Sequence, residues 1–384
     1  MNVKVVKSIS EIPSEAWDRL VPSEFPFASY AFLNALEASG SVGTGTGWEP
    51  SYLILNSGDE LLGALVLYSK TNSYGEYIFD FAWAEAYARF GLNYYPKFLS
   101  GIPFTPATGP KILVARSVDN ADECRRVLVT AALELTKRHD FSSIHFNFIE
   151  ESELSLFERE QLLIRHSFQY HWKNQNYKNF DEFLSKLKGK RRRDITRERE
   201  KVAKSGLKIE RLTGDALRSG HAEIMYAFYV NTVSKMGGYP YLTQQFFAEV
   251  FKTMKENILF VLATDPVTGE PVAGAINFFG SDTLFGRHWG SVDDFKFLHF
   301  ELCYYQAIDF AIERNLKYFE AGAQGEHKFQ RGFSPELTYS AHFISDPQMS
   351  DAIGRFIEEE KVQIKSLFEE YEAHSPFLSM DPRF

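Results

Sequence analysis

Apolar and polar positions along the chain predict two blocks of secondary structure that follow the same order. The first block is predicted to contain strands at 51–56, 61–70 and 77–81, a helix at 122–139, a strand at 141–150, a short helix at 158–166 and a strand at 168–172. The second is predicted to contain strands at 257–264, 271–280 and 283–289, a helix at 298–314, and strands at 317–321 and 338–344.

A matching dipeptide supports a duplication. Gly63-Ala64 in the first block occupies the same strand position as Gly274-Ala275 in the second. The first block also has roughly 35 additional residues, which the offsets place between its third strand and its long helix. Because a hairpin followed by a helix and a strand is a common order, these features suggest a duplicated domain without proving it.

The element order predicts an α/β (α+β) chain with tandem domains, each a mixed and mostly antiparallel sheet flanked by helices. A length of 384 residues exceeds the usual size of a single core. We expect an N-terminal domain at 1–172, a basic helical connector at 173–206 and a C-terminal domain at 207–384.

The composition is that of a globular protein and excludes a mostly disordered chain, with 44% hydrophobic and 24% charged residues. The two cysteines, Cys124 and Cys303, are far apart in predicted helices, which argues against a disulfide framework or a cysteine metal site. The first residues lack the apolar region of a signal peptide, and no apolar stretch has the length of a membrane span. We therefore expect a soluble, cytoplasmic protein.

Residues 181–204 are basic although the chain as a whole is acidic. Ten basic and five acidic residues give this segment a net charge of +5. Because the whole chain has a net charge of −9, the remaining residues together carry −14. Apolar residues recur at helical intervals, which predicts one amphipathic helix with a cationic outer face. Most such faces are only solvated, but Arg191, Arg192 and Arg193 are dense enough to suggest a polyanion partner such as tRNA, another phosphate-bearing donor or a lipid head group.

The glycine-rich stretch 319–333 concentrates residues able to do acid, base and electrostatic work. Glu326 and His327 are candidate general bases. Candidates for binding substrate or neutralising an anion are Gln324, Lys328 and Arg331. The competing interpretation is a set of ordinary surface salt bridges.

Further candidates lie on the helix and strand before this stretch. Glu301 and Tyr304 at the start of the predicted helix are candidate catalytic residues, although a buried or capping role for Glu301 is equally consistent with its position. The candidate substrate-binding residues there are Arg287, Trp289 and His299. Alternation along the strand predicts that Arg287 and Trp289 share one face and His288 occupies the other.

Two classes of site are excluded by missing motifs. The ten histidines include no HExxH or cysteine-pair spacing, so we predict no metal site. GxxxxGK[ST] is also missing, which argues against an ATP-dependent ligase.

The order of elements resembles the GNAT acyltransferase fold, and two such blocks in one chain resemble the Fem aminoacyltransferases. The strings that carry the narrower resemblance, to FemAB-like proteins, are LHFELCYYQAIDFAI, AGAQGEHKFQRGF and SYGEYIFDFAWAEAY, and the similarity covers nearly the whole chain. Lys328-Phe329 followed by Gly332-Phe333 resembles the Fem pattern of a lysine shortly before Gly-Phe. The resemblance implies a V-shaped opening between two central strands, where an acyl carbonyl meets an acceptor amine.

The chain departs from these families at two places. Gly109-Pro110 matches the Arg-Gly-Pro signature of Fem proteins, but Thr108 stands where arginine is expected. The glycine-rich RxxGxG phosphate loop of acetyl-CoA enzymes is missing before Leu298, and the corresponding link GSVDDFKFLH carries two acids that would repel a pyrophosphate. These departures put first-domain substrate contacts in doubt and favour a Fem-type donor over acetyl-CoA.

Together, the residues and the resemblance predict an N-acyltransferase that moves an acyl or aminoacyl group to an amine, such as a peptidoglycan precursor or a peptide. We expect no tightly bound cofactor, and acyl-CoA or aminoacyl-tRNA as the co-substrate. The alternative is a catalytically silent module that binds an anionic peptide or glycan.

Overall fold

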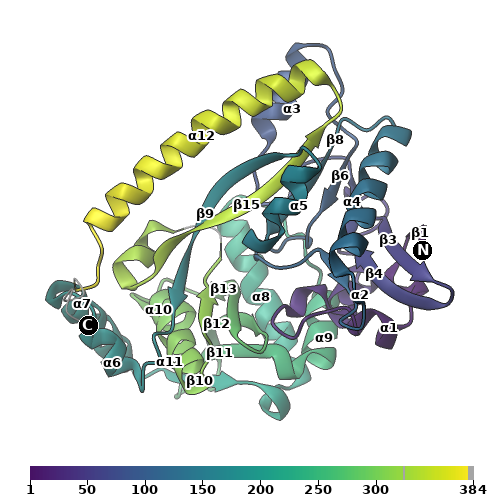
Figure 1. Ribbon diagram of the computed structural model, residues 1–384. Helices are drawn as coiled ribbons and strands as arrows, with labels where there is room; N and C mark the ends of the chain where they lie inside the picture. The colour runs from purple at the N-terminus through teal and green to yellow at the C-terminus, as the bar shows by residue number, and fades with distance from the viewer. Residues whose placement is uncertain (323–324, 379–384) are drawn as a thin grey trace. The chain divides into compact units, whose positions relative to one another are not determined.

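The computed structural model describes residues 1–322 and 325–378, so Gln324 lies outside the described residues (Figure 1). The chain forms two compact units. The first contains residues 1–168 and 337–367, and the second contains residues 169–336 and those from 368 onward. The predicted boundaries at 172 and 206 concern the two sequence repeats, and they remain predictions.

The first unit contains two groups of paired strands. One has the order β1 (Asn2–Val6), β3 (Tyr52–Ser57), β4 (Glu60–Leu65) and β7 (Ile112–Val114), all antiparallel. The other has the order β2 (Trp48–Pro50), β5 (Leu67–Lys70), β6 (Lys97–Ser100), β8 (Ser143–Ile149) and β15 (Ser334–Ile344). Within this second group β6 and β8 are parallel, and the other pairs are antiparallel.

Helices and short helical turns cover these strands. They are η1 (Ile9–Glu11), α1 (Ser14–Asp18), η2 (Pro26–Ala28), α2 (Tyr30–Ala38), α3 (Phe81–Arg89), α4 (Ala121–Arg138), η3 (Glu151–Glu153), α5 (Leu154–Arg159) and the part of α12 (Pro347–Ala373) up to residue 367.

Helix α4 shows how the sequence builds the first core. The Asn120 side chain caps its first turn by accepting a hydrogen bond from the Glu123 N–H, and basic residues occupy its last turn. Its buried face, which includes Leu128 and Ala132, packs on β3, β4 and β7 (Figure 1). The predicted helix at 122–139 is thus confirmed.

The third strand of the first block differs from the prediction. Residues 77–81 are not a strand, because Tyr77 has a left-handed φ of 60° and α3 begins at Phe81. The third strand consists instead of β6 and β7, which pair with β5 and β4. The additional residues therefore lie before this strand, at 71–96, and within it, at 101–111, rather than after it. The short helix also lies earlier than predicted, at Leu154–Arg159.

The second unit contains strands in the order β10 (Lys208–Leu212), β11 (Ile258–Thr264), β12 (Pro271–Phe279), β13 (Thr283–Ser291), β14 (Tyr318–Glu320) and β9 (Leu163–Lys173). Its helical segments are α6 (Phe180–Ser185), α7 (Gly189–Ala203), η4 (Gly214–Ala216), α8 (Ser219–Lys235), α9 (Gln244–Thr253), η5 (Lys255–Asn257), α10 (Leu298–Phe300), η6 (Glu301–Tyr305), α11 (Gln306–Glu313) and η7 (Glu326–Arg331). The strands predicted at 257–264, 271–280, 283–289 and 317–321 are confirmed.

The repeat extends to the register of the strands. Gly63 is opposite Leu55 in the first unit, and Gly274 is opposite Leu262 in the second. Both units are thus mixed, mostly antiparallel sheets with the tandem GNAT-like order.

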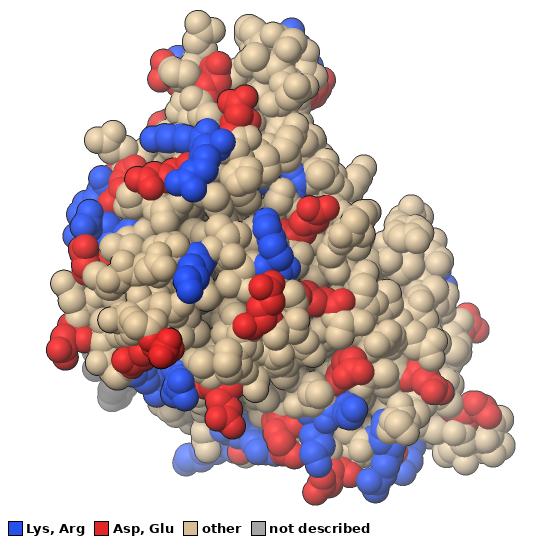
Figure 2. Space-filling view, turned by 90° about the vertical axis from the view of Figure 1, so that its right-hand side faces the viewer, with Lys and Arg blue, Asp and Glu red and all other residues tan. Residues whose placement is uncertain are grey.

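The basic segment forms two helices rather than the single one predicted. Helix α6 ends at Ser185 and α7 begins at Gly189, with Leu187 buried in the link between them. Helix α7 buries Ile195 and Val202, as the amphipathic pattern requires. Elsewhere on the molecule, the face drawn in Figure 2 shows basic and acidic side chains interspersed.

Gly290 sets the distance between β13 and the helix that covers it. A Cβ atom at this position would lie 2.0 Å from the backbone oxygen of Phe228 on α8. Only glycine fits there, so the helix can pack directly on the strand backbone.

We expect Gly290→Ala to destabilise the protein by about 2 kcal/mol, because α8 must move away from β13. The control is Gly220→Ala, at the start of α8, where a Cβ meets nothing within 4 Å. Urea unfolding of the two variants measures the difference. Equal stabilities would show that the α8–β13 contact adjusts without cost.

Candidate functional site

In each unit, a parallel pair of strands stays together over a short length. In the second unit Thr283–Phe285 pairs with Tyr318–Glu320, after which β14 ends while β13 continues to Ser291. In the first unit the parallel pairing joins 98–100 with 144–146. A short parallel pairing in which one strand runs on beyond the end of its partner is the arrangement for which the GNAT resemblance implies a V-shaped opening.

The helix that joins β13 to β14 contains a π-helical turn. Glu301–Tyr305 form this turn, and the Gln306 N–H donates to the Glu301 carbonyl five residues earlier. Phe297, immediately before the helix, has a left-handed φ of 68°. A π-helical turn inside an α-helix is found often at functional sites, because the additional residue redirects the side chains of that turn.

This turn places a phenol against an imidazole. The Tyr304 hydroxyl lies 2.8 Å from His327 Nε2, and His327 is exposed at the start of η7. Burial, and then the positive charges of Arg331 and Lys328, lower the pKa of His327 below 6.5. Burial raises the pKa of Tyr304. At neutral pH the pair therefore consists of a neutral imidazole and a protonated phenol.

Two more predicted residues join this pair. The His299 ring lies 5.4 Å from the Tyr304 ring and 5.9 Å from the His327 ring, between centroids. The Trp289 ring lies 4.8 Å from that of His299. Burial lowers the pKa of His299 to about 4, so this imidazole is also neutral. On the other face of β13, His288 contacts the Tyr229 ring, which confirms the predicted opposition of His288 and Trp289.

Arg287 lies at an irregularity of β13. The register of β12 and β13 shifts there, so that Gly286 and His288 pair with consecutive residues of β12. Such a bulge re-aims the side chain beside it.

Lys328 is buried beside the opening. Its ammonium donates to the Gly322 carbonyl at 2.8 Å, and burial lowers its pKa to about 8. Glu326 is exposed at the first position of η7. Lys328 is thus a cation held next to the His327 pair, whereas Glu326 faces solvent.

Arg331 holds η7 in place. Its Nη2 atom contacts both carboxylate oxygens of Glu198 at 2.8 and 3.0 Å, its Nε donates to the Tyr305 hydroxyl, and its Nη1 donates to the His327 carbonyl. The guanidinium also lies 3.4 Å from the centroid of the Phe300 ring. Arg331 therefore positions His327, and sequence analysis missed its partners Glu198 and Tyr305.

Glu301 is not brought together with His327. Its Oε1 accepts hydrogen bonds from Arg199 at 3.2 Å and Gln306 at 2.7 Å, and Arg199 also pairs with Asp309. This network joins α7 to the π-helical turn.

Of the three arginines predicted to bind a polyanion, Arg191 lies 4.0 Å from Asp194, while Arg192 and Arg193 are exposed.

The described residues, 1–322 and 325–378, contain no group of three His, Cys, Asp or Glu side chains placed to hold a metal ion. No helix in these ranges is long and apolar enough to cross a membrane.

Residues 8–379 match a family model described as peptidoglycan biosynthesis/recognition. The chain belongs to the FemAB-like family. No curated protein matches this FemAB-like chain in sequence. The predicted resemblance to FemAB-like proteins is thereby confirmed.

Several solved structures share the fold at low sequence identity. The crystal structure of FemX has a TM-score of 0.56 and 12% identity, covering 92% of this chain and 100% of FemX. The C-terminal domain (DUF2156) of a protein assigned as a lysylphosphatidylglycerol synthetase, from Agrobacterium fabrum, has a TM-score of 0.54 and 10% identity, covering 90% of this chain and 96% of its own. A conserved protein of unknown function from Bacteroides thetaiotaomicron has a TM-score of 0.50 and 8% identity, with coverages of 89% and 99%.

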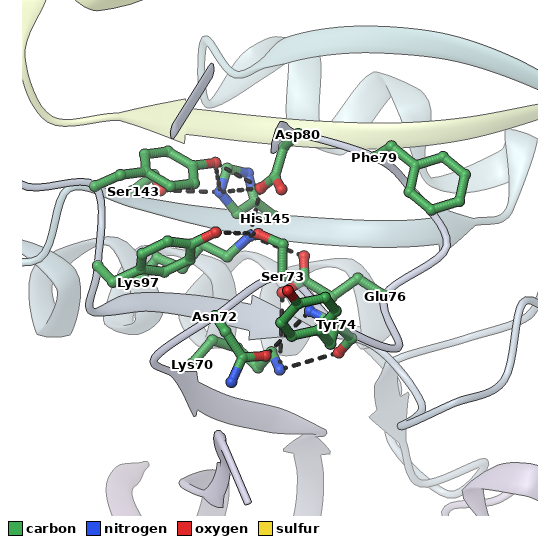
Figure 3. Close-up of polar contacts among 12 residues, drawn as sticks. Lys70, Asn72, Ser73, Tyr74, Glu76, Phe79, Asp80, Lys97, Ser143 and His145 are labelled. Carbon is green, nitrogen blue, oxygen red and sulfur yellow. Dashed lines mark hydrogen bonds and ion pairs between the residues drawn. The ribbon is translucent and has the colours of Figure 1, made fainter. Parts of the chain in front are cut away.

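The first unit of the FemAB-like protein contains a buried polar cluster that the sequence did not reveal (Figure 3). The Lys97 ammonium donates to Ser73 Oγ at 3.0 Å, to Glu76 Oε2 at 2.8 Å and to Asp80. One feature of the sequence could have indicated the cluster. A lysine stands at one end of each of two largely buried strands, Leu67–Lys70 and Lys97–Ser100.

A chain of hydrogen bonds continues from Asp80 through the first unit. Tyr94 donates to Asp80 Oδ2 at 2.6 Å and lies 3.1 Å from His145 Nε2. His145 Nδ1 lies 2.7 Å from His342 Nδ1, and His342 Nε2 lies 2.8 Å from Ser340 Oγ. Burial lowers the pKa of His145 to about 3 and that of His342 well below 6.5, so both imidazoles are neutral at neutral pH.

We expect Glu198→Gln to destabilise the protein by about 3 kcal/mol, because it leaves the Arg331 guanidinium without its counter-charge. Glu200→Gln, on the same helix but exposed, is the control and should change stability by less than about 0.5 kcal/mol. Thermal and urea unfolding measure both effects. A wild-type stability for Glu198→Gln would remove Arg331 from its role as the anchor of η7.

Proposed function

We propose that this FemAB-like protein is an N-acyltransferase that transfers an acyl or aminoacyl group to the amine of a peptidoglycan precursor or peptide. One observation carries the proposal: the neutral His327 and protonated Tyr304 lie 2.8 Å apart on the elements that flank the separation of β13 and β14. Amine acyl transfer needs a base for the amine proton and an acid for the leaving group.

The pair can move that proton without a metal or a covalent intermediate. In the tautomer that the proposal requires, with the proton of His327 on Nδ1, Tyr304 donates to His327 Nε2, and the phenolic oxygen can accept a proton from the attacking amine. As the nitrogen bonds to the carbonyl carbon, the amine proton passes to Tyr304 and the phenolic proton passes to His327. The imidazolium then returns a proton, through Tyr304, to the oxygen or sulfur of the departing group.

Lys328 supplies positive charge for the oxyanion of the tetrahedral intermediate. One of its three N–H groups donates to the Gly322 carbonyl, and among the described residues the other two have no hydrogen-bond acceptor, so we assign them to the ligand. A fixed cation in a partly buried site stabilises a developing oxyanion more strongly than one in water. The lowered pKa of about 8 leaves Lys328 mostly charged at neutral pH.

The donor we propose is an activated acyl ester or thioester, either aminoacyl-tRNA or acyl-CoA. The link before α10 carries Asp293 and Asp294, both exposed, and α10 itself has three residues. These features disfavour a pyrophosphate at that helix start. The exposed Arg192 and Arg193 on α7 are the residues of the second unit that we assign to a phosphate-bearing donor.

We expect Tyr304→Phe to lower kcat by 10²–10⁴-fold, since it keeps the ring but removes the transferred proton. Tyr318→Phe, at an exposed tyrosine of β14, is the control and should retain activity. The assay supplies aminoacyl-tRNA or acyl-CoA together with an amine-bearing muropeptide, and calorimetry measures ligand binding separately. The silent binding module would be favoured instead if the wild type transferred no acyl group and Tyr304→Phe bound a ligand as tightly as the wild type does.

We expect kcat to depend on pH with two limbs. On the acid side, activity should persist below pH 6.5, because the pKa of His327 lies below that value and its base form survives there. On the alkaline side, activity should fall above about pH 8 as Lys328 loses its proton. Lys328→Arg should move the alkaline limb upward. An alkaline limb that stays at pH 8 in this variant would assign it to another group.

A further inference from the structure

The buried cluster of the first unit is a second candidate site, separate from the acyl-transfer residues and independent of that proposal. Lys70 and Lys97 are directly opposite in the register of β5 and β6, so their side chains share one face of the sheet. Neither is exposed at all. Two like charges facing each other across strands destabilise a sheet unless anions neutralise them.

The neutralising groups come from one segment. Residues 71–96 join β5 to β6, and this segment supplies Glu76 and Asp80, the carboxylates that pair with the two lysines. It also supplies Ser73, so three oxygen atoms of one segment surround the Lys97 ammonium in the way that the oxygens of a phosphate or carboxylate would (Figure 3).

This segment is an addition to the repeated fold. In the second unit the equivalent strands β12 and β13 are joined by residues 280–282 alone. The fold therefore does not need 71–96 to connect its strands. The two lysines belong to the sheet, and the anions belong to the insertion.

The first part of the insertion, residues 71–80, is held down mainly by polar contacts. Its buried side chains are Ser73, Glu76, Ile78 and Asp80, so Ile78 is the apolar one. Tyr74 and Phe79 are 59% and 56% exposed and contribute little apolar burial. Hydrogen bonds to its backbone and the buried charge pairs therefore hold this part closed, and a competing anion can replace the charge pairs.

The pairing is also incomplete. Lys70 lies 3.8 Å from Glu76 Oε1, and that oxygen has no hydrogen-bond partner among the described residues. Asp80 Oδ1 is likewise buried without one. The Lys70 ammonium also lies 3.7 Å from the centroid of the Trp48 ring, a contact supplied by β2 rather than by the insertion, and 3.4 Å from the Tyr74 carbonyl oxygen of the insertion.

We propose that Lys70 and Lys97 form a binding site for an oxyanion, a phosphate or carboxylate group of a ligand, and that residues 71–80 close this site with Glu76 and Asp80 in the ligand's place. The site lies at the start of β6, at the opposite end of the parallel β6–β8 pairing from the point where these strands separate. Opening exchanges two internal carboxylates for an external anion. A phosphate dianion replaces both negative charges, whereas a ligand carboxylate replaces one of them.

Hydrogen exchange read by peptide mass spectrometry tests this proposal on the full chain. Inorganic phosphate should accelerate exchange of the amides in 71–80 relative to sodium chloride at equal ionic strength, and leave those of 258–279 unchanged. Acetate in a parallel titration distinguishes a general oxyanion site from one for phosphate. Equal exchange in phosphate, acetate and chloride, or equal acceleration of both segments, would overturn the proposal.

Variants sharpen the test. Glu76→Gln weakens the internal anion, so the half-effective phosphate concentration should fall about tenfold, the value for one charge-assisted hydrogen bond. Lys70→Met should abolish the response. Glu85→Gln, which breaks an exposed pair with Arg89 on α3, is the control and should match the wild type. A full response to phosphate in Lys70→Met would contradict the proposal. If a variant does not fold, the comparison of phosphate with chloride on the wild-type protein decides the question by itself.

Discussion

The short parallel pairing between β13 and β14 is the constraint on which the candidate site depends. Three residue pairs join these strands, and small residues occupy the point where they part. A Cβ on Gly286 would lie 3.3 Å from the Phe319 ring and 3.4 Å from the Ala321 backbone, so the strands approach closely before they separate. Beyond Phe285, β13 pairs with β12 on one side and with no strand of the described residues on the other. Backbone groups on that other side need partners, and a substrate can provide them.

The ion pair between Arg331 and Glu198 holds η7 in position. Gly325 and Gly332 flank η7, and glycine by itself favours many conformations. Arg331 connects η7 to α7 through Glu198 and to the π-helical turn through Tyr305. The basic segment therefore has two faces with different roles, since Glu198 and Arg199 point into the unit while Arg192 and Arg193 remain exposed.

The second block could be predicted well because its strands are continuous buried runs and its turns carry strong signals. The prediction failed at 77–81, where apolar residues alternate as in a strand but Tyr77 adopts a left-handed conformation and the segment covers a sheet instead of joining it. The candidate residues His299, Tyr304 and His327 could be named from the sequence individually. Their meeting could not be predicted, because it requires a π-helical turn that no spacing rule encodes. The burial of Lys97 depends on carboxylates 17 and 21 residues away, and local patterns do not report such pairs.

The two units differ in a way that supports assigning the proposed chemistry to the second. Both contain imidazoles hydrogen-bonded to hydroxyl groups near the parallel strand pair. In the first unit His145 and His342 are 1% and 2% exposed, and every hydrogen bond of their chain ends inside the protein. In the second unit His327 is exposed. A general base must release its proton to solvent or product in every cycle, and a sealed imidazole with a pKa of about 3 can neither take up that proton at neutral pH nor pass it on. The same residue types therefore stabilise one unit and can support turnover in the other.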